Sequence, residues 1–229
     1  MRRSRINEIM AEADEFIRSF GFILPPFAYW TPDDFKARKD TARGLIDARM
    51  GWDITDFGQG DFDRLGLFLF TLRNGSLSDL KRGSGMCYAE KLLVSRRDQL
   101  LPSHTHVIKA EDIINRGGAT LAVRLNGSNP DGTFSETAGG AVRCDGLARP
   151  FAGGEVLLLQ PGESVTLMPG DWHAFWGEGG DVLIGGVSAV TADLTDNVFR
   201  SPKIGRFSEV EEDAGPTHLL VSDYDRWLA

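Results

Sequence analysis

The sequence predicts a mostly β protein, a single barrel or sandwich preceded by helices. Glycine and proline, 27 and 10 residues respectively, are spread along the whole chain, which suits many short strands joined by tight turns. Strand-like segments also recur after residue 65 at intervals typical of a sandwich or barrel. A chain of 229 residues is long enough to bury one sizeable core. We therefore expect a single domain over residues 1–229.

Residues 1–50 are predicted to form a mainly helical N-terminal extension. Apolar residues near its start recur at spacings of three and four, as they do along one face of an amphipathic helix. This helix is expected to end near Gly21 and Pro25, because both residue types interrupt helices. A helix packed against the barrel or a partner subunit is favoured over one that binds a separate target.

A second helix is predicted to begin at Thr31. Pro32 at the first helical position and Asp34 in the first turn are typical of a helix start. The polar sequence that follows is expected to continue this helix to about Met50.

The barrel is predicted to occupy residues 65–200, and residues 201–229 to form a C-terminal extension. Gly117 and Gly118 are expected to form a turn. The segment 126–154, rich in Gly, Asn and Asp, is expected to be an insertion on the barrel surface. The clearest strand candidates lie at 67–72, 88–94, 121–125, 155–159, 164–168 and 182–187.

Three of the four histidines and one glutamate form the most informative pattern in the chain. They are His104, His106, Glu111 and His173. Imidazole and carboxylate together suit manganese, iron, cobalt, nickel or zinc, whereas calcium and magnesium favour ligand sets made of oxygen alone. The pattern therefore predicts a site for a divalent transition metal, and it is much more specific than scattered structural histidines.

Strand geometry sets a condition on this site. Side chains alternate between the two faces of a strand, so His104 and His106 point the same way, as do Lys109 and Glu111 if their segment is extended. His106 and Glu111 are separated by an odd number of positions. The chain must therefore bend or bulge between them if both are to reach one metal ion.

Composition excludes several classes of function. The formal net charge of −8 argues against nucleic acid or an anionic membrane as the main partner. Two cysteines, Cys87 and Cys144, are too few for a disulfide framework, which favours a reducing compartment. Charged residues interrupt the apolar positions of segment 1–23, and no apolar run approaches the roughly 18 residues of a membrane span. We expect a cytoplasmic protein that acts on small molecules.

The same residues resemble a known family. HTH at 104–106 with Glu111, and PGDWH at 169–173, resemble the two motifs of the cupin superfamily. That resemblance implies a double-stranded β-helix, or jelly-roll barrel, with the N-terminal helices packed outside it. Longer segments, spread over nearly the whole chain, are similar to D-lyxose isomerases of the longer type: PPFA at 25–28, GWDIT at 51–55, LRNGS at 72–76, YAEK at 88–91 and KAEDIINRGG at 109–118.

The resemblance implies an activity and a cofactor. Members of this family interconvert D-lyxose with D-xylulose and D-mannose with D-fructose through an enediol, prefer Mn²⁺, and form homodimers. It implies that His104, His106, Glu111 and His173 hold the metal, with Zn²⁺, Co²⁺, Ni²⁺ or Fe²⁺ as other candidates. Glu111 is also expected to exchange a proton with the sugar. Lys109 is expected to donate to a sugar oxygen, although a surface lysine beside the barrel mouth is an alternative.

Three further residues are candidates for substrate binding. Trp172 can present an apolar face to the sugar, although a buried tryptophan of the barrel is equally compatible with its position. Glu90 and Lys91 are adjacent on a predicted strand and face opposite ways, so at most one lies in the pocket, and Glu90 is favoured. Asp193 is a third candidate.

One position departs from the pattern that the resemblance implies. The strand after the last histidine is expected to carry an acid/base glutamate, but this chain has Gly186 there. A general base contributes about 10²- to 10⁴-fold to rate. Glu90, Asp193 and Glu212 are candidate replacements. Two alternatives to isomerisation follow, a metal-bearing cupin that binds sugar with weak or altered catalysis, and an oxygen-using enzyme with the same ligand set.

Overall fold

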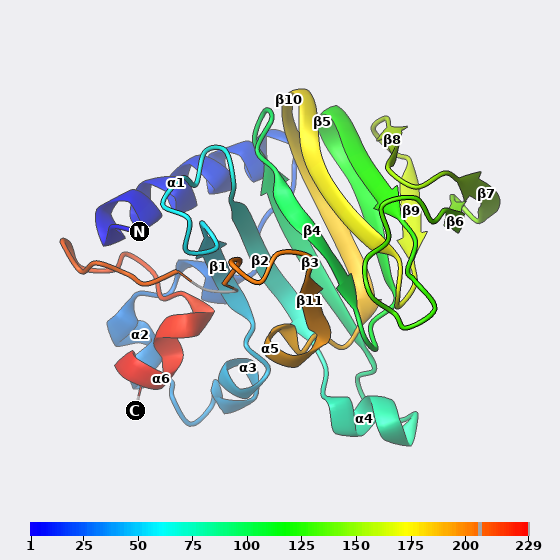
Figure 1. Ribbon diagram of the computed structural model, residues 1–229. Coiled ribbons are helices and arrows are strands. Elements are labelled where there is room, and N and C mark those ends of the chain that lie inside the picture. Colours follow the sequence, from blue (N-terminus) through cyan, green and yellow to red (C-terminus); the bar gives the residue numbers. More distant parts are fainter. Residues whose placement is uncertain (206–207, 229) are drawn as a thin grey trace.

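Strands make up the centre of the structure, and helices lie mainly along one side of them (Figure 1). The computed structural model describes residues 1–205 and 208–228, apart from the side chains of residues 193 and 194. The helical segments are α1 (Arg3–Ser19), η1 (Pro26–Tyr29), α2 (Pro32–Ala37), α3 (Arg43–Asp47), α4 (Leu77–Arg82), α5 (Asp193–Asp196), η2 (Val221–Asp223) and α6 (Tyr224–Trp227).

The strands pair antiparallel throughout, in the order β1-β2-β3-β10-β5-β9-β6-β7, while β4 pairs with β10 and β11, and β8 pairs with β5. The sheet begins with β1, so its first strand lies before the expected barrel start at residue 65. The strands are β1 (Gly51–Thr55), β2 (Leu67–Asn74), β3 (Tyr88–Ser95), β4 (Leu101–His106), β5 (Glu111–Asn126), β6 (Gly140–Cys144), β7 (Leu147–Phe151), β8 (Glu155–Leu159), β9 (Ser164–Leu167), β10 (Trp172–Ala189) and β11 (Asn197–Phe199).

The two longest strands, β5 and β10, pair along most of their length and link the two halves of the barrel. The turn expected at Gly117 and Gly118 is wrong, because β5 runs through both glycines. The register with β10 shifts on either side of this point, so the glycines bend the strand rather than end it. Gly118 has φ +96°, and a Cβ there would lie 2.3 Å from the Asp181 carbonyl oxygen. Only glycine fits this bend.

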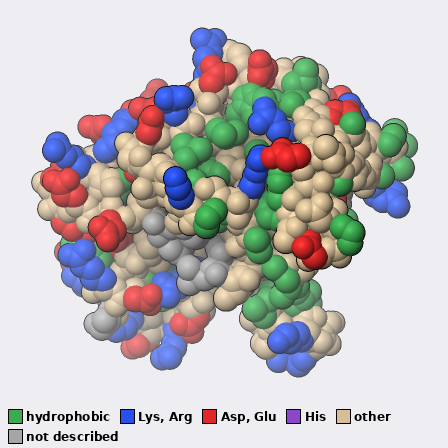
Figure 2. Space-filling model, viewed as in Figure 1, with side chains coloured by type: hydrophobic (Ala, Val, Ile, Leu, Met, Phe, Trp, Pro, Cys, Tyr) green, Lys and Arg blue, Asp and Glu red, His purple; other side chains and the backbone are tan. Residues whose placement is uncertain are grey.

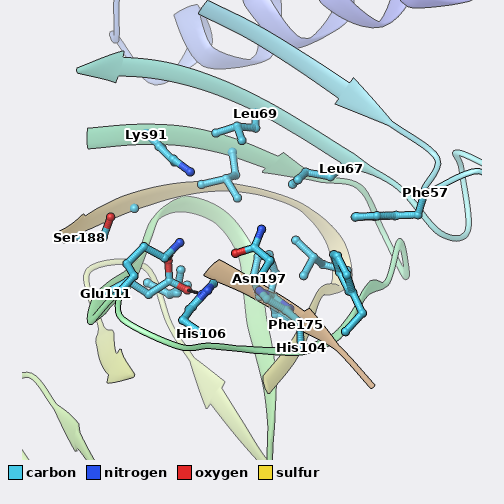
Figure 3. A pocket seen from close by; sticks show the side chains of 16 residues that line it. Phe57, Leu67, Leu69, Lys91, His104, His106, Glu111, Phe175, Ser188 and Asn197 are labelled. Carbon is cyan, nitrogen blue, oxygen red and sulfur yellow. Dashed lines mark hydrogen bonds and ion pairs between the residues drawn. The ribbon is translucent and has the colours of Figure 1, made fainter. Parts of the chain in front are cut away.

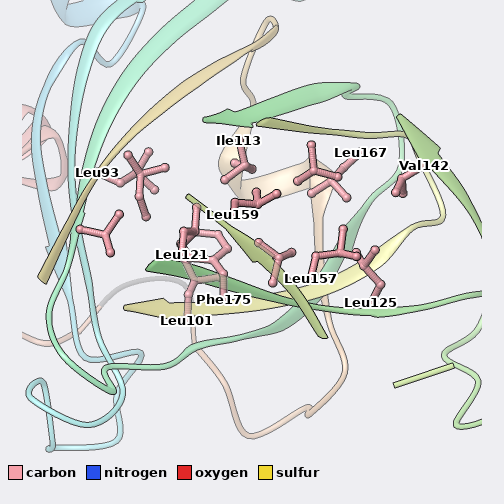
Figure 4. Packing of buried hydrophobic residues seen from close by; sticks show 14 of the residues in the cluster. Leu93, Leu101, Ile113, Leu121, Leu125, Val142, Leu157, Leu159, Leu167 and Phe175 are labelled. Carbon is pink, nitrogen blue, oxygen red and sulfur yellow. The ribbon is translucent and has the colours of Figure 1, made fainter. Parts of the chain in front are cut away.

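The main core fills the barrel with side chains from the inward-facing positions of its strands (Figure 4). On β8, Leu157 and Leu159 are buried whereas Leu158 between them is 54% exposed, as strand alternation requires. Each fully buried leucine contributes about 1.5–3 kcal/mol relative to an exposed one. The central residues of this core include Leu93, Leu101, Ile113, Leu121, Leu125, Val142, Leu167 and Phe175.

Helix α1 covers the outer surface of the sheet, as its apolar spacing predicts. Its buried residues join a second core that includes Phe68 and Phe70 of β2 and Leu92 of β3. The chain leaves the helix at Gly21, whose φ of +74° is the left-handed conformation common after helix ends. The buried face of α1 consists of Ile6, Ile9, Met10, Ala13 and Ile17.

The second predicted helix starts as expected but is much shorter. Thr31 and Asp34 form reciprocal side-chain to backbone hydrogen bonds, which cap the start of α2. The helix ends at Ala37, and turns separate it from α3, so the continuous helix to Met50 is wrong. Asp40 and Thr41 lie in this break, and the Thr41 hydroxyl donates to the Arg38 carbonyl. Such side chains compete with helical hydrogen bonds.

The segment 126–154 is more ordered than the expected surface loop, because it contains the hairpin of β6 and β7. Asp145 and Gly146 form its two-residue turn, with φ of 49° and 83°. Positive φ at both positions is typical of the type I′ turn that joins twisted strands. The Asp145 carboxylate also accepts the backbone N–H and the hydroxyl of Ser164, at 3.0 and 2.8 Å.

The surface over the helical side carries acidic and basic side chains in alternation, whereas hydrophobic side chains are more frequent over the strands (Figure 2). No single basic patch dominates the face shown there. Among the described helices, none is both long enough and apolar enough to cross a membrane.

A buried ion cluster joins the two ends of the chain. Arg3 is fully buried and makes two hydrogen bonds of 2.8 Å to Asp223 and two of 2.9 Å to Glu212. Each carboxylate thus accepts two hydrogen bonds from the Arg3 guanidinium, which is the strong, bidentate form of this contact. Removing one partner leaves a buried charge without compensation, which costs far more than losing an exposed pair.

We predict that Arg3→Met lowers the free energy of unfolding by about 3–5 kcal/mol, because the buried Asp223 carboxylate loses its partner. Urea unfolding at neutral pH measures this change. Arg5→Met is the matched control. Arg5 lies on the same helix as Arg3 but forms only partly exposed ion pairs, so its substitution should cost about 1 kcal/mol or less. Equal losses in the two variants would contradict this assignment.

Hydrogen bonds from Arg3 hold the pKa of Glu212 below its ordinary value of 4.5. A carboxyl group with a lowered folded pKa stabilises the protein above its unfolded pKa, and this contribution disappears as the pH falls through the folded pKa. The wild-type protein should therefore be more stable than Glu212→Gln at neutral pH, and the difference should shrink below pH 4.5. Urea unfolding of both proteins over this range checks the sign. A difference that grows on acidification would refute it.

Candidate metal centre

Strands β4 and β10 bring the three histidines together. Alternation along β4 sends His104 and His106 to the same face, and His173 at the start of β10 pairs directly with His104. All three are buried, with exposures of 6%, 3% and 1%. Glu111, at the first position of β5, completes the cluster, and one potential ligand atom from each of the four residues lies within 4.8 Å of all the others.

The bend that the spacing requires lies between β4 and β5. The chain leaves β4 at His106 and enters β5 at Glu111, and the four intervening residues lie outside both strands. This turn brings the carboxylate back to the histidines. Glu111 Oε1 lies 2.8 Å from His106 Nε2 and 3.3 Å from His173 Nε2.

Backbone carbonyls set the orientation of two imidazole rings. The Nδ1 atom of His104 lies 2.9 Å from the Pro102 carbonyl oxygen, and that of His173 lies 3.1 Å from the Asp171 carbonyl oxygen. A carbonyl oxygen only accepts hydrogen bonds, so each Nδ1 must carry the proton and donate it. The Nε2 atoms then carry lone pairs, which is the form that binds metals.

Burial and charge favour the protonation states of metal ligands. Burial lowers the pKa of His104 well below its usual value, and the imidazoles of His173 and His106 lower it further. Burial also lowers the pKa of His106, against the opposing charge of Glu111. Burial raises the pKa of Glu111, but the Lys109 ammonium and the His106 imidazole outweigh this, so the pKa lies well below its ordinary range. These shifts favour neutral imidazoles at His104 and His106 and an ionised carboxylate at Glu111.

A divalent cation fits the contacts within this cluster. When the His173 ring is neutral, its Nε2 lone pair faces a carboxylate oxygen of Glu111 at 3.3 Å, and two acceptors at this separation repel each other unless a cation lies between them. The buried Nε2 atom of His173 also has no hydrogen-bond partner in the described part of the chain. Neighbouring ligand atoms around one such ion are about 3 Å apart when each is about 2.1 Å from it. The observed separations of 2.8 and 3.3 Å match that spacing.

The cluster opens on a cavity that also contains two lysines (Figure 3). Lys109 is 4% exposed, and its Nζ atom lies 2.8 Å from Glu111 Oε2. Lys91 of β3 lines the same cavity, although the sequence favoured its neighbour Glu90 for the pocket. The remaining wall is mainly apolar and includes Phe57, Leu67, Leu69, Phe175 and Phe199, with Ser188 and Asn197 as polar members.

The prediction that Glu90 lies in the pocket is wrong. Its carboxylate forms an ion pair with Arg73 and lies on the outer surface of the sheet, beside Phe20 and Phe22. Adjacent residues on a strand face opposite ways, so placing Lys91 inward sends Glu90 outward.

The Trp172 ring also lies away from the cavity. Its Nε1–H donates to the Ser128 hydroxyl at 3.1 Å, and its ring packs edge to face with Phe134. His173 follows it on the strand and points inward, so Trp172 must point outward. Asp193 lies at the start of α5, but its side chain is outside the described part of the structure.

Gly186 lines the cavity, where the sequence analysis expected a glutamate. A Cβ atom at this position would lie 3.5 Å from Leu93 Cδ1 and 3.7 Å from Lys91 Cβ, which is ordinary contact. The backbone at this position can therefore accept a Cβ atom without a clash. Glu212, one of the suggested replacements, is bound to Arg3 and Arg226 instead. Among the described side chains, Glu111 is the carboxylate that lines the cavity.

Comparisons with known proteins agree with the sequence resemblance. The sequence model of the D-lyxose isomerase family matches residues 1–224. A D-lyxose/D-mannose isomerase from Serratia proteamaculans is 43% identical over 232 residues, which cover all of both chains. A D-lyxose/D-mannose isomerase from Escherichia coli O157:H7 is 41% identical over 229 residues, with 98% of each chain covered.

Solved structures confirm the fold class. L-Ribose isomerase from Acinetobacter sp. DL28, in complex with L-ribose, has a TM-score of 0.62 and 15% identity, covering 92% of this chain and 98% of that one. L-Ribose isomerase from Cellulomonas parahominis covers the same shares, with a TM-score of 0.57 and 16% identity. The expected mostly β barrel with helices outside it is therefore confirmed. The full-length sequence match goes further: this chain belongs to the D-lyxose isomerase family of enzymes.

Proposed function

We propose that this protein is a manganese-dependent isomerase that interconverts D-lyxose with D-xylulose and D-mannose with D-fructose. The observation that carries the proposal is the buried cluster of three histidines and one glutamate beside a cavity that also contains Lys109. Two full-length relatives at 41% and 43% identity are named D-lyxose/D-mannose isomerase, which supports D-lyxose and D-mannose as substrates. His104, His106, Glu111 and His173 are the proposed metal ligands.

Isomerisation moves a hydrogen between adjacent carbons of the open-chain sugar, and the two oxygens on those carbons gain negative charge on the way. The bound cation would supply Lewis-acid stabilisation of that charge. Lys109 and Lys91 line the same cavity from different elements, the turn before β5 and strand β3, and low solvent access strengthens the effect of charges there. We assign Lys109 to donate to a sugar oxygen, and Lys91 to stabilise charge from the opposite strand.

Glu111 is the proposed group for proton exchange. Its Oε1 atom faces the histidines, whereas Oε2 faces Lys109 at 2.8 Å. The carboxylate thus has one oxygen for the ion and one on the cavity side. The Lys109 contact keeps that second oxygen ionised and therefore able to accept a proton.

Sugar binding with weak turnover is the second candidate function. One observation favours it, because Gly186 supplies no acid/base group where the family resemblance implies a glutamate. The proposed ligands and the cavity remain, so sugar binding does not require an acid/base group at this position. The identity of the ion, a homodimeric assembly and a cytoplasmic location are further predictions, which metal analysis, sedimentation and fractionation test.

We predict that His104→Ala lowers kcat/KM for D-lyxose and D-mannose by at least about 10³-fold, since Lewis-acid stabilisation is worth several kcal/mol and each 1.4 kcal/mol is tenfold. Ketose formation with added Mn²⁺, without oxygen, is the measurement. His218→Gln is the matched control, because His218 packs against Trp52 outside the site. Activity that survives in His104→Ala would overturn the metal mechanism. In a separate assay with oxygen present, oxygen uptake by the wild-type protein would indicate the oxygen-using alternative.

Gly186→Glu and Gly186→Gln separate the two candidate functions. The side chains are similar in size, but only glutamate transfers a proton, so the glutamate variant should turn over D-lyxose about 10²-fold faster or more. Steady-state rates at saturating Mn²⁺ give the ratio. Equal turnover in both variants would show that position 186 is not a missing base, and a wild-type rate well above both would remove the weak-turnover candidate.

A further inference from the structure

A buried carboxylate outside the proposed ligand set binds the turn between His106 and Glu111. Asp196 is 4% exposed and lies at the end of α5. Its Oδ1 atom accepts the backbone N–H groups of Val107 at 3.1 Å and Ile108 at 2.7 Å. Its Oδ2 atom accepts the N–H of Lys109 at 3.2 Å.

These three N–H groups are consecutive in the turn that leaves β4 and enters β5. Because the turn lies outside both strands, its N–H groups need partners other than a neighbouring strand. A buried N–H without a partner is costly, and a carboxylate acceptor makes the stronger, charge-assisted kind of hydrogen bond. Asp196 therefore restricts the conformation of the turn.

Asp196 is itself anchored to the strand that carries the histidines. The next residue, Asn197, starts β11 and pairs with His106, and Phe199 pairs with His104. The Asp196 carbonyl oxygen also accepts the Val107 N–H at 3.1 Å. One short segment thus contacts both β4 and the turn beyond it, so it fixes the two relative to each other.

We propose that Asp196 is a positioning residue that holds Glu111 and Lys109 at the correct place against the histidines. It touches neither the proposed ligand atoms nor the substrate cavity, and it acts through the backbone of residues 107–109. The expected effect of Asp196 on turnover rests on the proposed function. The expected effect of Asp196 on metal affinity does not depend on which sugar the protein converts.

The test is Asp196→Asn, which keeps the size of the side chain but replaces one acceptor oxygen by an NH₂ group that cannot accept an N–H. Residues that orient metal ligands typically contribute about 10- to 100-fold to metal affinity. We expect the dissociation constant for Mn²⁺, measured by calorimetry without sugar, to rise by about that factor. At saturating Mn²⁺, kcat should also fall more than KM changes, because Lys109 is displaced.

Asp145→Asn is the matched control. Asp145 also binds a backbone N–H, that of Ser164, but in the β6–β7 hairpin. The Asp145→Asn substitution should leave Mn²⁺ affinity unchanged. Unchanged Mn²⁺ affinity and kcat in Asp196→Asn would overturn the positioning role, as would equal losses in the two variants. A wild-type protein that binds Mn²⁺ but converts no sugar would refute the proposed function alone, since the effect on affinity remains measurable.

Hydrogen exchange of the wild-type protein provides a second measurement if Asp196→Asn fails to fold. The amides of residues 107–109 should exchange slowly, like those of the strands, although they lie in a turn with exposed Val107 and Ile108 side chains. Rapid exchange of these amides would contradict the proposal. Failure of the wild-type protein to bind Mn²⁺, Co²⁺ or Zn²⁺ would overturn it together with the proposed metal centre.

Discussion

The site depends on one constraint, the odd spacing between His106 and Glu111. A straight strand would send these two side chains to opposite faces, so the carboxylate can meet the imidazoles only if the chain turns between them. The turn from β4 to β5 satisfies this requirement and brings Glu111 Oε1 to 2.8 Å from His106 Nε2. The position of Glu111 against the histidines and its contact with Lys109 both depend on this local geometry.

The same turn explains the charge balance of the site. It places Lys109 beside Glu111, and this ammonium helps to keep a buried carboxylate ionised. Neutral imidazoles, an ionised carboxylate and two lysines are then gathered within a mainly apolar cavity. A divalent cation held by His104, His106, Glu111 and His173 would offset the carboxylate charge and reduce its repulsion with the imidazole nitrogens. The fold thus provides a site that is electrostatically suited to a metal ion and to a substrate that becomes negative.

Much of the site could be predicted because its signals are local. Strand alternation and residue type were enough to group the three histidines with Glu111 and to require the bend. Whether Glu90 or Lys91 faces the cavity depends on how β3 packs against its neighbouring strands. The sequence of β3 alone does not specify this packing. Asp196 lies 87 residues after Lys109, so no local pattern connects them. Likewise, glycines at 117 and 118 resemble a turn, whereas pairing with β10 makes them a bend within β5.

The most direct test of the central claim is a crystal structure of the protein loaded with Mn²⁺, with the ion located by anomalous scattering. The account predicts one ion bound by the Nε2 atoms of the three histidines and by Glu111 Oε1, with Asp196 still bound to the turn. An ion bound elsewhere, or one that Glu111 does not contact, would contradict the claim that the turn from β4 to β5 builds the metal centre.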